Sequence, residues 1–254
     1  MEISEIIDQA MKQAQEIANS YTYPVFVSDA KNKPDLIGSS VIIKLNDRYY
    51  SITASHVLTN VLDSGSQFII GIDGKYVSII GEFVYSSHDS KDHFDIAFIE
   101  LSSNFVKKNN ILYLQQSKLL LDQHQVHIAF IHGFPCSKNK QTKALLGTKK
   151  FKLKAYSYAG VIKSDFYDWE KLGKIESIHT CMTYRKTSNM NTPTNPRGIS
   201  GGGLWLVPNL HEATEIYLDS ILIEYHESYK VTFSTKIRHI VEFIREHDLM
   251  GQQA

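Results

Sequence analysis

Short apolar runs separated by turn residues fill the chain from residue 24 onward, and they restrict what it can fold into. The runs are rich in Val, Ile, Tyr and Phe, which are the residues that β-strands favour. Two neighbouring pairs of runs are predicted to form hairpins, one closed by Asn46-Asp47 and the other by Asp73-Gly74. The pattern therefore predicts an all-β dominated body of antiparallel strands.

The expected strands fall into two groups of similar size, and each end of the chain is predicted to form an amphipathic helix. Both end segments place apolar residues at helical spacing among charged ones. The predicted units are an N-terminal helix over 1–20, a first β-module over 21–115, a second β-module over 116–235 and a C-terminal helix over 236–254. The N-terminal helix is a candidate docking surface.

The charge balance does not indicate an anionic partner. The chain carries 27 Lys and Arg against 27 Asp and Glu, without a long block of either sign. We therefore expect neither nucleic acid nor a membrane surface as a partner. The first residues lack the basic start and apolar stretch of a secretory signal, so we expect a cytoplasmic protein.

Metal and thiol chemistry find little support in the sequence. Four metal-capable residues lie close together: His88, Asp89, Asp92 and His93. Their spacing matches neither a calcium loop nor a zinc signature. Cys136 and Cys181 lack a nucleophile motif and are expected to be buried structural thiols. We expect no metal and no disulfide framework.

A glycine-rich turn surrounds Ser200. The segment 198–203 reads Gly-Ile-Ser-Gly-Gly-Gly, and a backbone without side chains can turn tightly and direct consecutive N–H groups at one point. Such donors stabilise an oxyanion, so the segment predicts a nucleophile beside an oxyanion hole. A flexible loop is the alternative for this segment taken alone.

Two further residues can supply the base and the group that orients it. His56 follows the apolar run that ends at Ala54, at a place where an imidazole can lie at the edge of a core. Asp95 precedes the apolar run 96–99, where a carboxylate needs a polar partner. Taken singly, each residue has a structural explanation.

Taken together, these segments resemble the trypsin-like serine peptidases. The family's motif Thr-Ala-x-His-Val is present at 53–57, Asp-Ile-Ala at 95–97 and Gly-x-Ser-Gly-Gly at 198–202. The order His, Asp, Ser is that of chymotrypsin and differs from those of subtilisin and the α/β-hydrolases. The resemblance covers residues 24 to 246 and implies two six-stranded antiparallel β-barrels of the chymotrypsin type.

The resemblance also implies a role for each site residue. Ser200 would attack the scissile carbonyl, His56 would act as base and then as acid, and Asp95 would hold the imidazole tautomer. The N–H groups of Gly198 and Ser200 would bind the oxyanion. The substrate would be a protein or peptide, and no cofactor is implied. The implied substrate-binding positions are Thr194, Ile223, Glu224 and Tyr225.

The resemblance also bears on substrate specificity and on regulation. Neutral Thr194 at the pocket base argues against strict selection for Arg or Lys, although Glu224 offers an acidic wall. Secreted zymogens of the family have an aspartate where this chain has Ile199, so activation by N-terminal cleavage is not expected. The chain is more similar to intracellular bacterial members, in which either loops or a regulatory protein partner order the oxyanion hole. A role in bacterial stress or defence is a hypothesis from that resemblance.

Two alternatives stay open. The serine motif also fits the nucleophile elbow of α/β-hydrolases, which lies between a strand and a helix. Here Pro193 and Pro196 precede the serine and a strand-like run follows it, which disfavours an elbow. The second alternative is a catalytically silent double barrel that acts as a protein-binding module, since a fold does not guarantee a function.

Overall fold

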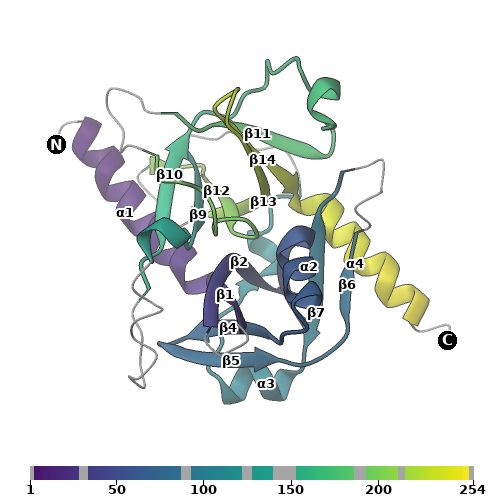
Figure 1. The fold of residues 1–254 in the computed structure, drawn as a ribbon. Coiled ribbons are helices and arrows are strands. Elements are labelled where there is room, and N and C mark those ends of the chain that lie inside the picture. Colours follow the sequence, from purple (N-terminus) through teal and green to yellow (C-terminus); the bar gives the residue numbers. More distant parts are fainter. Residues whose placement is uncertain are drawn as a thin grey trace.

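The computed structural model of this protein describes residues 3–28, 34–86, 93–121, 128–139, 153–185, 193–210 and 215–251. Within these residues the chain forms two curled sheets and places a long helix at each end (Figure 1). This arrangement confirms the predicted fold, which is mostly β with two β-units and terminal helices.

The first sheet has the strand order β5-β4-β1-β2-β3-β7-β6, and β8 pairs with β2. Both predicted hairpins are present, and Asn46 and Asp73 have the positive φ angles, 51° and 48°, that tight hairpin turns require. The short pairing of β8 with β2 is parallel. The strands are β1 (Thr22–Ser28), β2 (Pro34–Leu45), β3 (Arg48–Ala54), β4 (Phe68–Ile72), β5 (Lys75–Ile79), β6 (Phe83–Tyr85), β7 (Ile96–Leu101) and β8 (Leu114–Gln115).

The second sheet has six strands in the order β10-β9-β12-β13-β14-β11, and all of its pairs are antiparallel. The strands are β9 (Ile128–Gly133), β10 (Tyr156–Gly160), β11 (His179–Thr183), β12 (Gly203–Val207), β13 (Tyr217–His226) and β14 (Val231–Lys236). The sequence pattern began two of these strands at 126 and 152, which lie outside the described residues.

The helices are few, and most are short. The α-helices are α1 (Ile3–Tyr21), α2 (Ser55–Asp63), α3 (Ser103–Lys108) and α4 (Ile237–Gly251). The single turns of 3-10 helix are η1 (Gln116–Lys118), η2 (Cys136–Lys138) and η4 (Glu170–Leu172). In the described part of the chain, no helix has the length and the hydropathy needed to cross a membrane.

Helix α1 contacts both sheets through small residues. Ala10, Ala14 and Ala18 are buried, and their short side chains let the helix lie close to β9 and β12 of the second sheet and β1 and β2 of the first. At its end, the ring of Tyr21 stacks on Trp205, with 6.5 Å between the ring centroids. The apolar face of this helix is therefore part of the core.

Helix α4 follows directly from β14 of the second sheet and reaches the first (Figure 1). Its Phe243 ring packs edge-on against Phe98 of β7, at 5.6 Å between centroids. Near its end, the Asp248 carboxylate accepts a hydrogen bond of 2.7 Å from the Tyr50 hydroxyl of β3. The two curled sheets, here called the first and second barrel, are therefore held together by a helix at each end of the chain.

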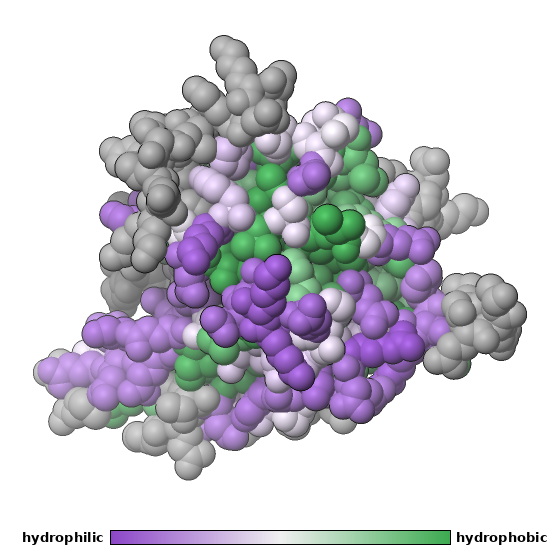
Figure 2. Space-filling model, turned by 90° about the horizontal axis from the view of Figure 1, so that it is seen from below, coloured by the Kyte–Doolittle hydropathy of each residue, from purple (hydrophilic) through white to green (hydrophobic). Residues whose placement is uncertain are grey.

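The interior between these elements is apolar. Its largest fully buried side chains include Trp205, Tyr50, Phe26, Phe130 and Phe233. Burial of such side chains is the main source of stability in domains of this kind. Figure 2 shows the outer surface from below, where apolar residues are also exposed in the middle of the face and hydrophilic residues surround them.

Candidate active site

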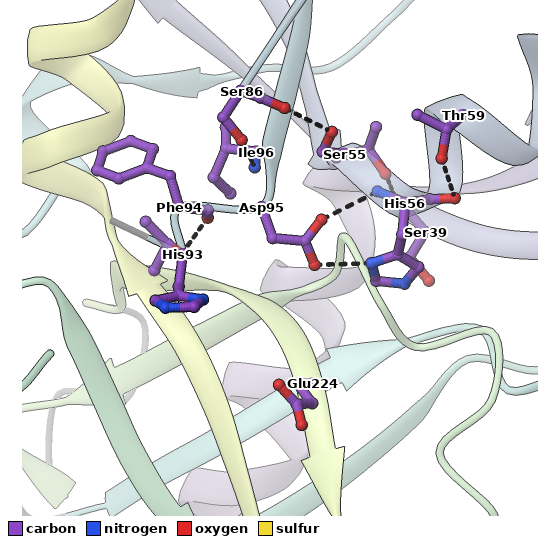
Figure 3. Close-up of polar contacts among 12 residues, drawn as sticks. Ser39, Ser55, His56, Thr59, Ser86, His93, Phe94, Asp95, Ile96 and Glu224 are labelled. Atoms are coloured by element: carbon purple, nitrogen blue, oxygen red, sulfur yellow. Dashed lines mark hydrogen bonds and ion pairs between the residues drawn. The ribbon is translucent and has the colours of Figure 1, made fainter. Parts of the chain in front are cut away.

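His56 and Asp95 are joined by two hydrogen bonds (Figure 3). His56 Nδ1 lies 2.7 Å from Asp95 Oδ2, and the His56 backbone N–H donates to Asp95 Oδ1 at 2.9 Å. Because a carboxylate only accepts hydrogen bonds, the proton of a neutral His56 ring lies on Nδ1. This leaves Nε2 with a lone pair that can accept a proton from a nucleophile.

The local structure explains why these two side chains meet. His56 is in the first turn of α2, where backbone N–H groups lack partners inside the helix. Ala54 occupies the N-cap and provides no side-chain hydrogen bond. Asp95, which immediately precedes β7, supplies the missing acceptor. One carboxylate oxygen thus caps the helix and the other holds the imidazole.

The backbone of Asp95 is fixed as well. Its φ angle is 45°, in the left-handed region, which Asp tolerates better than most residues. Its carbonyl accepts a hydrogen bond of 2.9 Å from the N–H of Ser55. Ser55 Oγ in turn donates to the Ser86 carbonyl at 3.1 Å. The helix that carries His56 and the loop that carries Asp95 are therefore connected through their backbones.

Ser200 lies in a turn that other parts of the chain hold in shape. The Ser39 hydroxyl donates to the Gly198 carbonyl at 2.8 Å, and the Ser39 N–H donates to the Ser200 carbonyl at 2.8 Å. The Cys136 N–H donates to the Arg197 carbonyl at 2.8 Å. Since the C=O and N–H of a trans peptide point in opposite directions, this last bond directs the Gly198 N–H away from Cys136.

Two backbone donors of the turn have no partner within the described residues. The N–H groups of Ile199, Gly201 and Gly202 donate to the carbonyls of Pro196, Leu222 and Ile199, respectively. Those of Gly198 and Ser200 have no hydrogen bond to any described residue. These are the two donors expected to bind an oxyanion, and their free state is what such a site requires.

Glycine at position 201 is a structural requirement of the turn. Its φ angle is +82°, and a Cβ there would overlap the Ser39 carbonyl oxygen and Thr53 Oγ1. We expect Gly201→Ala to lower the free energy of unfolding by about 2 to 5 kcal/mol, from backbone strain and overpacking together. Urea unfolding would measure the change.

Gly65→Ala provides the matched control for that experiment. Gly65 has a φ of +61° and open space around the built Cβ, so its replacement adds backbone strain of about 1 to 2 kcal/mol without a clash. If both variants lose equal stability, the close packing of Gly201 against the first barrel has no energetic role.

One cleft of about 750 Å³ brings the predicted residues together. His56, Asp95 and Ser200 line it. So do all four predicted substrate positions, Thr194, Ile223, Glu224 and Tyr225. In the described part of the chain, no hydrogen bond joins Ser200 Oγ to His56, a separation that is common in catalytic sites without substrate.

The wall of this cleft contains an ion pair that the sequence did not reveal. Lys174 Nζ lies 2.7 Å from Glu224 Oε2, and the lysine side chain is only 8% exposed. The Glu224 charge is therefore compensated, so this residue does not form the free acidic wall that the sequence suggested. Tyr184, whose hydroxyl donates to the Thr194 carbonyl at 2.7 Å, fixes the base of the cleft.

Among the described residues, no three His, Cys, Asp or Glu side chains are placed to hold a metal. His88, Asp89 and Asp92 of the metal-capable segment lie outside them. Cys136 and Cys181 are not joined in a disulfide; Cys181 is buried as expected, whereas Cys136 is only partly buried. Burial raises the pKa of Cys181 to about 12, which makes it unreactive near neutral pH.

Ser39 and Cys136 support the turn of Ser200, a role that sequence analysis assigned to neither position. Both support the Ser200 turn through hydrogen bonds to its backbone. Backbone contacts between residues far apart in sequence leave no local motif. No signal in the sequence singles out these two positions.

Two curled antiparallel sheets with a helix at each end fit the chymotrypsin-like fold. They also exclude the α/β-hydrolase alternative, because the turn of Ser200 leads directly into strand β12 of an antiparallel sheet. The fold and the site together define a class of protein: a double β-barrel in which His, Asp and Ser side chains line one cleft.

Comparison with known proteins agrees with this fold. The serine endoprotease from Yersinia pestis is similar over 92% of this chain, with a TM-score of 0.55 and 16% identity, and 65% of that chain is covered. A structure from a study of coupled folding and binding of the disordered Sesbania mosaic virus VPg protein is similar over 89% of this chain and 90% of that chain, with a TM-score of 0.53 and 16% identity. No family model and no curated protein matches the sequence.

Proposed function

We propose that this protein is a serine endopeptidase of the trypsin-like type. The observation that carries the proposal is that the His56–Asp95 pair and Ser200 line one cleft, and that the two free amides belong to the turn of Ser200. In this mechanism Ser200 Oγ attacks the peptide carbonyl while His56 Nε2 takes its proton. The N–H groups of Gly198 and Ser200 stabilise the developing oxyanion, and His56 then protonates the leaving amine.

Hydrolysis proceeds through an acyl-enzyme in this proposal. The amide C–N bond breaks as the first tetrahedral intermediate collapses, which leaves the acyl group on Ser200 Oγ. Water attacks this ester with His56 again as the base, and Ser200 leaves as the alcohol. Asp95 stays ionised throughout and stabilises the imidazolium that forms in each half-reaction.

The serine turn supports an enzyme that needs no N-terminal cleavage. Ile199 is fully buried at the position where zymogens of the family have an aspartate. The turn is held instead by Ser39 and Cys136. We infer a peptidase whose activity is limited by narrow specificity or by a protein partner.

Covalent labelling with a fluorophosphonate tests this function directly. We expect one adduct per chain by intact-mass spectrometry, mapped by peptide analysis to Ser200, and none on heat-unfolded protein. The reagent mimics the tetrahedral intermediate, so labelling requires both the activated serine and the oxyanion donors. The absence of an adduct on Ser200 would contradict the proposal and favour the protein-binding module.

A further inference from the structure

The loop that carries Asp95 has a strained backbone. His93 and Asp95 have φ angles of 51° and 45°, so two of three consecutive residues are in the left-handed region. For residues other than glycine this conformation costs about 1 kcal/mol or more each. It persists only where surrounding contacts hold it in place.

Three consecutive carbonyls of this loop accept hydrogen bonds. His93 O accepts from His179 Nε2 at 3.1 Å, Phe94 O accepts from Thr235 Oγ1 at 2.7 Å, and Asp95 O accepts from the Ser55 N–H at 2.9 Å. Only the last donor belongs to the first barrel. Figure 3 shows His93, Phe94 and Asp95 as one continuous segment between the two parts of the molecule.

The two donors from the second barrel are adjacent. His179 is the first residue of β11 and pairs directly with Thr235 of β14. Both residues are buried, at 1% and 0% exposure. The sheet holds cross-strand partners at a fixed separation. His179 and Thr235 therefore present two rigidly placed donors to the consecutive carbonyls of His93 and Phe94.

Both ring nitrogens of His179 face backbone groups. Nε2 lies 3.1 Å from the His93 carbonyl oxygen, and Nδ1 lies 3.0 Å from both the N–H and the carbonyl oxygen of Ile175. The tautomer with its proton on Nε2 satisfies both sides of the ring, because Nε2 then donates to His93 and Nδ1 accepts from the Ile175 N–H. Burial lowers the pKa of His179 to about 4, so the ring stays neutral near pH 7. Bonded to backbone at both nitrogens, the imidazole is a rigid spacer between the two barrels.

We propose that His179, together with Thr235, is a positioning residue for the His56–Asp95 pair. By holding the His93 and Phe94 carbonyls, the second barrel sets the direction in which the Asp95 carboxylate points at His56. The catalytic consequence rests on the proposed peptidase function. The geometric part of the proposal is that the His56–Asp95 hydrogen bond depends on His179. This part holds whether or not the protein is a peptidase.

The test compares variants that differ only in the donor. His179→Phe keeps a planar ring and removes the donor, whereas His179→Gln retains an N–H donor at a similar reach. Thr235→Val removes one hydroxyl, and its matched control is Thr232→Val, since Thr232 Oγ1 is also buried in β14 but donates at 3.4 Å to Met182 of its own barrel. Thermal unfolding confirms that each variant is folded at the assay temperature.

Two readouts separate the geometry from the chemistry. The first is the far-downfield proton NMR resonance of His56 Nδ1–H in its hydrogen bond to Asp95, which needs no peptidase activity. The second is the rate constant of fluorophosphonate labelling. We expect His179→Phe to lose or broaden the resonance and to label about 10- to 100-fold more slowly, as a small misplacement of a reacting group does. His179→Gln and Thr232→Val should retain both signals.

Each outcome decides the proposal. An unchanged resonance and labelling rate in folded His179→Phe would overturn it, as would equal losses in Thr235→Val and Thr232→Val. If His179→Phe does not fold, the comparison of Thr235→Val with Thr232→Val decides alone. If the wild-type protein never labels, the peptidase function fails, and the resonance still tests the positioning role.

Discussion

Replacing Ser200 by alanine is expected to abolish the fluorophosphonate adduct and to lower peptide hydrolysis by about 10⁶-fold, the loss typical when a catalytic serine is removed. Ser200 is the residue proposed to form the acyl-enzyme. The Ser200 hydroxyl has no hydrogen bond to another described residue. The free energy of unfolding should therefore stay within about 0.5 kcal/mol of the wild type.

The control for that experiment is Ser78→Ala, which removes a hydroxyl from strand β5, remote from the cleft. Among the described residues, Ser78 Oγ donates to the Gln67 side chain and to no residue of the cleft, so labelling should be unchanged. Peptide hydrolysis rates and intact-mass spectra of both variants show whether Ser200 is the nucleophile. Persistent labelling in Ser200→Ala would show that the nucleophile is another residue.

Asp95→Asn is expected to slow labelling by about 10⁴-fold while the fold persists. Asparagine presents an N–H donor where Asp95 Oδ2 now accepts from His56 Nδ1. The proton of the ring then moves to Nε2, which can no longer take a proton from Ser200. The second carboxylate oxygen, which caps α2, is replaced by an amide oxygen that can still accept.

Asp219→Asn is the matched control for this change. Asp219 also accepts a hydrogen bond, from Thr180 Oγ1 at 2.8 Å, but it lies in the second sheet and does not line the cleft. Labelling kinetics of both variants, at a temperature below their melting points, give the comparison. A rate for Asp95→Asn within tenfold of the wild type would contradict the assigned role of Asp95.

Most of the fold is predictable because its signals are local. Alternating apolar runs and two-residue turns are properties of neighbouring residues, and they identified both hairpins of the first sheet. Helix α2 was missed because it begins directly after β3 without a capping side chain of its own. Its cap is Asp95, 39 residues further along the chain.

The same difference between local and distant signals decides which residues of the candidate site could be predicted. The residues proposed for chemistry stand in short motifs, so His56, Asp95 and Ser200 could be selected from the sequence. The residues that hold them could not, because His179, Thr235 and Ser39 act on backbone groups far away in sequence. The compensation of Glu224 by Lys174 was hidden for the same reason, since an ion pair across 50 positions has no sequence pattern.

The placement of α4 has a consequence for the order of events during synthesis. Domains generally begin to fold from the N-terminus while the chain is still being made. The first barrel, which holds His56 and Asp95, needs Asp248 for Tyr50 and Thr235 for the loop before β7. An unfinished chain on the ribosome therefore carries an incomplete site. If the proposed function holds, hydrolysis begins only after the chain has been translated as far as Asp248.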